Sequence, residues 1–469
     1  MENQATSQPA LTPDDESALD QPITRRLLLT FGLPTIFALV VMNSFTILDG
    51  VFAMRRLGAV PMAAVTVVTP AVVFIIGVAM IFSTGGGAVI VKKIGQGKIA
   101  EARANFTFLF ISAVVMSIAI TVIGIALYGS LLRMLGADDY VFDAARSYVT
   151  ILLAGAPLVA ISAIGTGFLI ADGKPALSMG LTLLGSFVSA GLNAMFLFGF
   201  NMGIEALAWA TVIGYTVPAA ATLVYFGRRA KPGLRFVHPT LDLPMLGRSL
   251  FIGLGPFITI MATATITVVM NNTLIRLDNV GVFGVAAAGM VLAIIQTVAA
   301  AGLGYVQGVS PLIAFNYGAG NRARLQSLMR ANAKSVGVIA VAGIVVTLTL
   351  ADPLIRIYDV YGTELHTMAV RGLRITALSF AFAGFNALIQ STFSALNNGP
   401  VSGALAVVRS FGLTVPLLLL LPRVFALDGV WFALPAAEAA ALLISLVVLI
   451  VVGKRYGLFN ASTGWVSPE

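Results

Sequence analysis

The sequence predicts an all-α integral membrane protein with twelve transmembrane helices in two pseudo-symmetric lobes of six helices. Three observations predict this class. Hydrophobic residues make up 58% of the chain and charged residues only 10%, against about 25% charged residues in soluble domains. Apolar runs of about 20 residues recur between charged breaks, and a helix of that length crosses the hydrocarbon core. Finally, a short phrase of small residues occurs twice.

The apolar runs give the elements in order. The twelve predicted helices cover residues 27–51, 62–90, 104–130, 148–170, 176–199, 207–226, 249–275, 282–314, 335–351, 374–396, 401–421 and 430–452. The runs lack the alternation of polar and apolar residues that marks the strands of a membrane β-barrel. We therefore expect helices throughout.

The repeated phrase defines the two lobes. Each member of the first copy returns 223 residues later: Gly58, Ala63-Ala64 and Gly95-Gln96-Gly97 are matched by Gly281, Ala286-Ala287 and Gly318-Ala319-Gly320. Each copy contains six helices, so both copies enter the membrane from the same side. We expect an N-lobe over residues 25–226, a C-lobe over residues 249–455, and a substrate site in the cleft between them.

Charge sets the expected topology. Placing the N-terminus inside assigns 18 basic residues to the inner face and 9 to the outer face, which favours cytoplasmic termini in a bacterial-type inner membrane. The net charge of +8 then reflects topology and not binding to nucleic acid. Residues 227–248 form a basic cytoplasmic linker across which the lobes could rock. Residues 1–24 form an acidic, disordered cytoplasmic tail, and residues 456–469 form a C-terminal tail.

Three ionisable side chains fall within the predicted helices, where such groups are costly and tend to be functional. Asp49 lies toward the outer part of the first helix. An apolar cavity favours the neutral form of a carboxyl group, so Asp49 could load and release a proton; its alternative role is a cap at a helix end. Arg409 and Glu438 lie at similar depths in helices eleven and twelve, so we expect an intramembrane ion pair, either a structural brace or a gating element.

Two prolines match across the repeat and are hinge candidates. Pro34 and Pro256 each lie a turn or two into their helices, where a kink could permit bending. The run Ser83–Gly87 lacks the lysine that completes a phosphate-binding loop, so we expect it to serve close helix packing. The chain has no cysteine, which excludes disulfides and thiol chemistry.

Several phrases together resemble one transporter family. These are Gly32-Leu33-Pro34, Asn43 through Asp49-Gly50, Gly95-Gln96-Gly97 and, most specifically, Gln307-Gly308-Val309-Ser310-Pro311-Leu312-Ile313-Ala314-Phe315-Asn316-Tyr317-Gly318-Ala319. They are similar to the motifs of the multidrug and toxic compound extrusion (MATE) family, in particular its DinF-like branch. The resemblance covers about residues 25–455 and implies a MATE-type fold of two six-helix lobes.

The resemblance also implies site residues. Asp49 falls on the coupling aspartate of the DinF-like branch, Asn193 on an asparagine of the fifth helix, and Thr211 on a threonine near the same cavity. Together with Asn43 and Phe45, these residues are the expected substrate and proton cavity. Phe45 stands where the family has a tyrosine.

Other departures bear on the coupling ion. Leu197 stands where archaeal relatives carry a second aspartate, and the seventh and tenth helices carry no carboxylate for the sodium site of the sodium-coupled branch. We therefore expect proton coupling through one carboxylate, with sodium as the alternative because its oxygen ligands are few.

The expected function is secondary antiport that exports cationic or amphipathic drugs in exchange for protons. The alternatives are export of one endogenous metabolite, flipping of a lipid-linked precursor, and sodium-coupled antiport. We expect a monomer in the lipid bilayer, with a small organic substrate and without cofactor, metal or nucleic acid. An intramembrane enzyme is the competing class. It is weakly supported, because the only histidines, His238 and His366, are expected on opposite faces and no nucleophile accompanies them.

Overall fold

The computed structural model describes residues 23–456 apart from 96–97, 173, 229–232, 278–279, 319 and 397, together with Leu458. Most of the two expected tails, and the repeat residues Gln96, Gly97 and Ala319, lie outside the described residues. All regular structure in the described part of the chain is helical. Eleven of its helices are long and apolar enough to cross a membrane. The twelfth span is α11, whose apolar parts are Leu243–Leu254 and Ile260–Ile275.

The N-lobe is built from the helices that precede the linker. They are α2 (Arg25–Leu57), α3 (Ala59–Met80), η1 (Ile81–Gly85), α4 (Gly86–Gly95), α5 (Ile99–Ala126), α6 (Tyr128–Leu135), α7 (Asp139–Ala154), α8 (Ala156–Ala171), α9 (Pro175–Ala194), η2 (Met195–Gly199) and α10 (Glu205–Gly227). The segments η1 and η2 are single π-helical turns that continue the helices before them.

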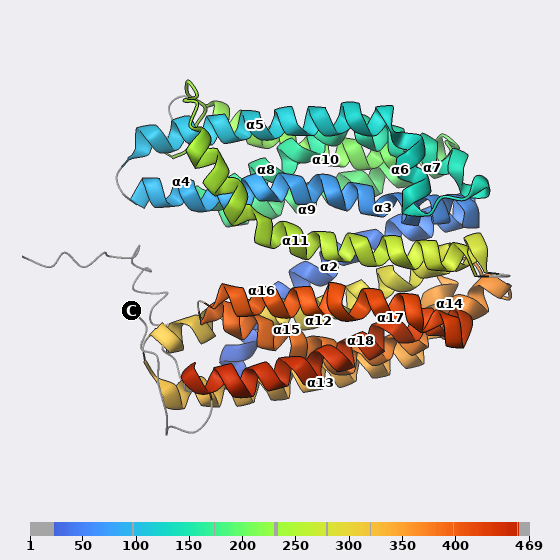
Figure 1. The fold of residues 1–469 in the computed structure, drawn as a ribbon. Coiled ribbons are helices and arrows are strands. Elements are labelled where there is room, and N and C mark those ends of the chain that lie inside the picture. Colours follow the sequence, from blue (N-terminus) through green and yellow to red (C-terminus); the bar gives the residue numbers. More distant parts are fainter. Residues whose placement is uncertain are drawn as a thin grey trace, which may run out of the picture.

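The C-lobe repeats this arrangement. It comprises α11 (Leu243–Ile275), α12 (Gly281–Gly318), α13 (Arg322–Arg356), α14 (Glu364–Thr376), η3 (Ala377–Ser379), α15 (Phe380–Ala395), α16 (Gly399–Val407), η4 (Val408–Thr414), α17 (Val415–Leu420), α18 (Pro422–Gly453) and η5 (Lys454–Tyr456). Figure 1 shows the two lobes as separate layers, blue to green above and orange to red below.

Local signals explain the helix ends, and one of them corrects a predicted boundary. Gly58 adopts φ 91°, a left-handed conformation that ends α2 and starts α3. Asp242 caps α11 by accepting a hydrogen bond from the Met245 N–H at 3.0 Å. Because this cap starts the helix at Leu243, the connection between the lobes is shorter than the predicted 227–248.

The described connection is also attached to the N-lobe. Asp172 accepts a hydrogen bond from the Leu234 N–H at 2.7 Å, and the Val237 N–H donates to Thr107 Oγ1 at 3.1 Å. The Phe236 ring stacks on Phe106 with centroids 5.2 Å apart. A rocking motion of the lobes therefore has to bend the chain after this segment.

The lobes share a core at one end of the molecule only. Leu27 and Leu458 belong to one apolar cluster. We call the end of the molecule that holds this cluster the inner end and the opposite end the outer end. At the outer end, Val67 and Leu153 of the N-lobe and Val285 and Leu373 of the C-lobe belong to a single buried cluster. At the inner end each lobe has its own cluster.

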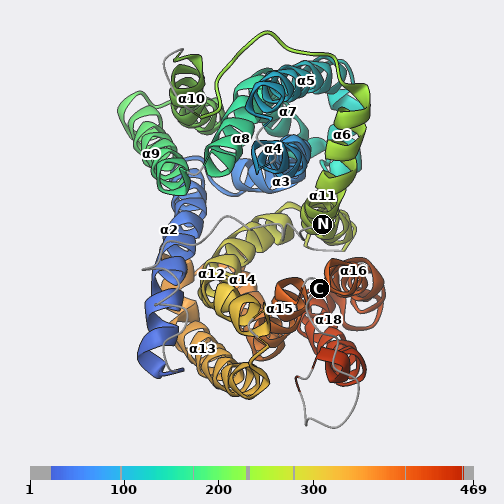
Figure 2. The same cartoon turned by 90° about the vertical axis from the view of Figure 1, so that its left-hand side faces the viewer.

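The first helix of each lobe exchanges its inner half with the other lobe. Leu27 and Leu28 of α2 lie in the inner cluster of the C-lobe, whereas Met245 of α11 lies in that of the N-lobe. Figure 2, viewed from the inner end, shows α2 running along the C-lobe on one side and the start of α11 reaching across to the N-lobe on the other. The exchange ties the lobes together where their cores are separate.

Glycines permit this exchange. A Cβ on Gly85 would lie 1.9 Å from the Ser249 carbonyl oxygen of α11, and a Cβ on Gly308 would lie 2.3 Å from the Phe31 carbonyl oxygen of α2. Gly85 and Gly308 are repeat mates, 223 residues apart. Only glycine allows backbones to approach this closely. The run Ser83–Gly87 thus contributes close packing through Gly85.

Candidate functional site

Asp49 and Asn193 meet inside the N-lobe. The Asn193 side-chain amide donates a hydrogen bond of 2.6 Å to Asp49 Oδ1. Asn193 is fully buried near the end of α9, and Asp49 is half-buried in α2. Such a donor stabilises a carboxylate in a membrane helix, because hydrocarbon cannot solvate its charge.

A cavity of about 260 Å³ opens beside this pair. Its walls come from α2, α8, α9 and α10: Met42, Phe45, Asp49, Ser162, Thr182, Gly185, Ser186, Ser189, Thr211, Gly214, Tyr215 and Pro218. The volume is slightly below the roughly 300–1,000 Å³ of pockets for drug-sized ligands. The cavity can therefore hold several waters or part of a bulky ligand beside Asp49.

Two tyrosines surround the carboxylate. Tyr148 lies near Thr211, and both Tyr148 and Tyr215 lie close enough to Asp49 to interact with its charge. Thr211 also donates to the Leu207 carbonyl oxygen at 2.8 Å. The site is a single carboxylate among hydroxyl groups, which suits the transfer of a proton or the attraction of an organic cation.

Phe45 and Asn43 behave differently from each other. Phe45 lines the cavity and packs edge-on against Phe187, with ring centroids 4.9 Å apart. Asn43 is not a lining residue of this cavity, so its role there stays a prediction. Its amide donates to the Leu39 carbonyl oxygen of its own helix at 2.9 Å. The reason is helical periodicity: positions 42, 45 and 49 share one face of α2, and position 43 is turned about 100° away.

The sequence analysis missed Tyr148, Tyr215 and the hydroxyl groups of α9. The sequence does contain a signal for the hydroxyl groups of α9. The polar residues Thr182, Ser186, Ser189 and Asn193 follow each other at spacings of three and four residues in an apolar helix, and this periodicity places them on one face. Tyr148 offered no such signal, because its role depends on which helices pack together.

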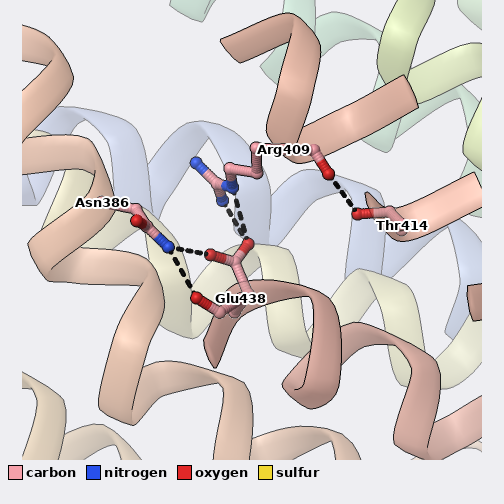
Figure 3. Close-up of polar contacts among 4 residues, drawn as sticks. All are labelled: Asn386, Arg409, Thr414 and Glu438. Atoms are coloured by element: carbon pink, nitrogen blue, oxygen red, sulfur yellow. Dashed lines mark hydrogen bonds and ion pairs between the residues drawn. The ribbon is translucent and has the colours of Figure 1, made fainter. Parts of the chain in front are cut away.

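Arg409 and Glu438 form an ion pair inside the C-lobe. Arg409 Nε donates to Glu438 Oε1 at 2.8 Å, and the Arg409 guanidinium contacts the same oxygen through Nη2. Figure 3 shows a third member, Asn386 of α15, whose amide donates to Glu438 Oε2 at 2.8 Å and to the Glu438 carbonyl oxygen at 2.9 Å. Both carboxylate oxygens of Glu438 therefore have a donor.

The local backbone places Arg409 at this point. Arg409 lies in the π-helical segment η4, where Thr414 Oγ1 donates to the Arg409 carbonyl oxygen at 2.9 Å (Figure 3). Its side chain borders a small apolar cavity of about 70 Å³, whose walls include Val336 and Phe380. This cavity shares no lining residue with the cavity at Asp49. The structure thus contains two separate polar centres, one in each lobe.

The two hinge candidates lie within the first helix of each lobe. Pro34 lies inside α2, and Pro256 falls within the bounds of α11, which changes direction between its two parts in Figure 1. Within the described residues, no three acidic or histidine side chains gather closely enough to hold a metal ion.

Comparisons with known proteins agree with this architecture. A family model described as MatE matches residues 34–195 and 245–420. The multidrug export protein MepA of Staphylococcus aureus (strain MSSA476) is 22% identical over 437 residues, which cover 92% of this chain and 94% of the relative. MepA of Staphylococcus saprophyticus is 22% identical over 396 residues, covering 84% and 86%.

Solved structures share the fold. An inward-facing conformation of a multidrug resistance MATE family transporter superposes with a TM-score of 0.84 at 19% identity, covering 91% of this chain and 99% of the other. An outward-facing conformation gives 0.72 at 19% identity, with 94% and 98% covered. A complex of the MATE multidrug transporter DinF-BH gives 0.75 at 22% identity, with 93% and 97% covered.

Twelve spanning helices in two repeated lobes, with a polar cavity inside one lobe, form the architecture of a two-lobed membrane transporter. The chain belongs to the MATE family of transporters, since the family model matches most of its length.

Proposed function

We propose that this protein is a secondary antiporter that exports cationic or amphipathic compounds in exchange for protons, with Asp49 as the coupling group. The observation that carries the proposal is the hydrogen bond of 2.6 Å from Asn193 to Asp49 beside a cavity. The names of its relatives support the export of drugs: MepA is a multidrug export protein, and DinF-BH is a multidrug transporter.

Protonation of one carboxylate suffices for exchange. When Asp49 is ionised, it accepts the hydrogen bond from Asn193 and attracts a cation into the cavity. When Asp49 takes up a proton, the attraction is lost and the cation leaves. A one-for-one exchange of a proton for a monovalent cation moves no net charge, so the pH gradient drives it, and each pH unit supplies about 1.4 kcal/mol, enough for a tenfold concentration ratio.

Contacts between the lobes at the outer end provide a gate for this exchange. Arg55 Nε donates to the Ile357 carbonyl oxygen at 2.7 Å, and the Asn272 amide donates to the Met134 carbonyl oxygen at 3.0 Å. With the shared apolar cluster, they close the outer end in this conformation. Export requires these contacts to break and the inner ends of the two lobes to approach each other.

The coupling role is tested with Asp49→Asn in proteoliposomes. We expect efflux of a cationic dye driven by a pH gradient to be lost, because an amide cannot take up a proton. Asp143→Asn is the matched control, since Asp143 is exposed in α7. Undiminished efflux by Asp49→Asn would refute the assignment. Repeating the assay with a sodium gradient separates the two ions: efflux driven by sodium alone would refute proton coupling.

The proposed topology places the inner end and both termini in the cytoplasm of a bacterial-type inner membrane, with the protein as a monomer of the DinF-like branch. The excess of basic residues near the inner end supports this orientation. Because the chain has no cysteine, a single introduced cysteine reports directly which side of the membrane its position faces. An impermeant thiol reagent added to whole cells should label Asp143→Cys and not His238→Cys, and the reverse pattern would invert the topology.

A further inference from the structure

Two neighbouring hollows lie on the membrane-facing side of the outer end, away from both polar centres. The first, of about 550 Å³, is lined by Met134, Val268, Val269, Asn272, Thr273, Arg276, Leu277, Leu419, Pro422 and Arg423. The second, of about 720 Å³, is almost wholly apolar and lies between α3, α5, α6 and α11. They share Met134 and Val268, so they form one continuous groove with a polar end and an apolar end.

The polar end carries two arginines without acidic partners. Arg276 lies at the C-terminal end of α11 and Arg423 at the start of α18, and both are exposed. Three other arginines at the outer end, Arg133, Arg356 and Arg371, each form an ion pair. In the part of the chain that the structure describes, neither Arg276 nor Arg423 has one. Two like charges beside one hollow repel each other unless an anion lies between them.

The apolar end suits a hydrocarbon chain. Its walls include Phe74 and Ile123, which are 41% and 59% exposed although they line a concave surface. The other lining residues are almost all aliphatic, such as Ile120 and Leu131. A concave, exposed surface of this kind at membrane depth has to be filled by something apolar.

The length of the groove matches one leaflet. Along α11 it reaches from Arg276 to Met261, which is about 22 Å at 1.5 Å per residue. Half of a bilayer, with its head groups, is about 20–22 Å thick. The outer part of α11 runs parallel to the neighbouring helices in Figure 1. The arginines thus lie at head-group depth, and Met261 lies near the bilayer midplane.

We propose that this groove is a binding site for an anionic phospholipid of the leaflet at the outer end. The phosphate lies between Arg276 and Arg423, and one acyl chain lies along α11 against α3, α5 and α6. The chain of the lipid would fill a wedge between α11 of the C-lobe and the N-lobe. Because the lobes have to separate there when the outer end opens, bound lipid favours the conformation in which the outer end is closed.

The test measures lipid binding to the purified full-length protein. Native mass spectrometry compares phosphatidylglycerol with phosphatidylcholine of the same chains, and soluble glycerol phosphate supplies the head group alone. We expect phosphatidylglycerol to bind most tightly, and Arg276→Gln/Arg423→Gln to weaken it about thirtyfold, since each basic residue contributes separately to anionic lipid binding. Arg276→Lys/Arg423→Lys should keep most of the affinity, which separates lost charge from misfolding.

Matched controls and contrary outcomes complete the test. Arg146→Gln/Arg374→Gln removes the same charge from exposed outer-end positions that do not line the groove and should leave binding unchanged. Thr265→Trp, which fills the apolar end, should weaken the lipid and not glycerol phosphate. Equal affinity for the two lipids, or an unaltered affinity in Arg276→Gln/Arg423→Gln, would overturn the proposal. Binding of glycerol phosphate as tight as that of the lipid would show a site for free anions instead.

Discussion

Asn193 and Asp49 are 144 residues apart in the chain, yet the Asn193 amide donates a hydrogen bond of 2.6 Å to Asp49 Oδ1. The repeat mate of Asp49 at an offset of 222 is Asn271, and it has a different role. Asn271 is buried where the lobes meet, with its amide 3.4 Å from the Thr66 carbonyl oxygen of the other lobe. The same position therefore holds a titratable group in one lobe and an interface residue in the other.

The hydrogen bond from Asn193 should set the pH range of transport. Asn193→Ala removes a donor that stabilises the ionised carboxylate more strongly than the protonated acid, so Asp49 would release its proton less readily. A hydrogen bond to a charged group exceeds one to a neutral group by about 1–1.5 kcal/mol, which corresponds to about one pH unit. We expect the pH profile of efflux to move upward by that amount. Ser189→Ala, which alters the same cavity without touching this bond, is the control, and an unchanged profile in Asn193→Ala would contradict the prediction.

Removing one member of the Arg409–Glu438 pair should destabilise the protein more than replacing both members with apolar residues. Removing one partner, in Arg409→Met or Glu438→Leu, leaves the other charge half-buried and should destabilise the protein by about 3 kcal/mol. The double variant should recover most of that loss, as measured by thermal unfolding in detergent.

Transport by the same double variant decides the role of the pair. If it is a structural brace, the stable double variant transports normally. If the pair is a gating element, the double variant is stable but inactive. Equal stability of both single variants and the native protein would show that the pair contributes nothing.

The hydrogen bond between Arg55 and the Ile357 carbonyl oxygen should hold the outer end closed. Arg55→Gln removes a bond of about 1–1.5 kcal/mol, so the population open at the outer end should rise roughly five- to tenfold. A cysteine at position 285, introduced by Val285→Cys into the buried cluster that both lobes share, reports this opening. Its labelling by a thiol reagent should speed up by the same factor, whereas Arg374→Gln should leave the rate unchanged.

Glycine at the exchanged helices should be indispensable. Gly85→Ala places a Cβ 1.9 Å from the Ser249 carbonyl oxygen, so α11 has to move away from the N-lobe. We expect a loss of about 2 kcal/mol or more. Gly180→Ala is the control, because nothing lies within 4 Å of its added Cβ, and there stability should be unchanged or slightly increased. A thermal unfolding midpoint of Gly85→Ala equal to that of Gly180→Ala would contradict the close packing of α11.

Much of the fold follows from local signals. The twelve spans are recognisable because each one is a long, predominantly apolar run that has to satisfy its backbone internally. Their ends were less predictable: α11 begins at Leu243 because Asp242 caps it, six residues before the apolar run at 249. Asp49 could be singled out because a carboxylate is rare within such runs, whereas Asn193 was reached only through the resemblance to the MATE family. Neither signal gives the direction of a side chain, as Asn43 illustrates.

The sequence by itself determined that this protein lies in a lipid bilayer, the number of its spans, their duplication and the presence of a carboxylate, Asp49, within the first span. Only the tertiary structure decided that α2 and α11 exchange their inner halves, that Tyr148 and Tyr215 lie near Asp49, and that Asn386 joins Arg409 and Glu438. The physical reason is that lipid is as apolar as the helix faces, so hydrophobicity specifies insertion and not partners. Partners are set by close contacts such as that of Gly85 with Ser249, and these exist only once helices from distant parts of the chain have packed.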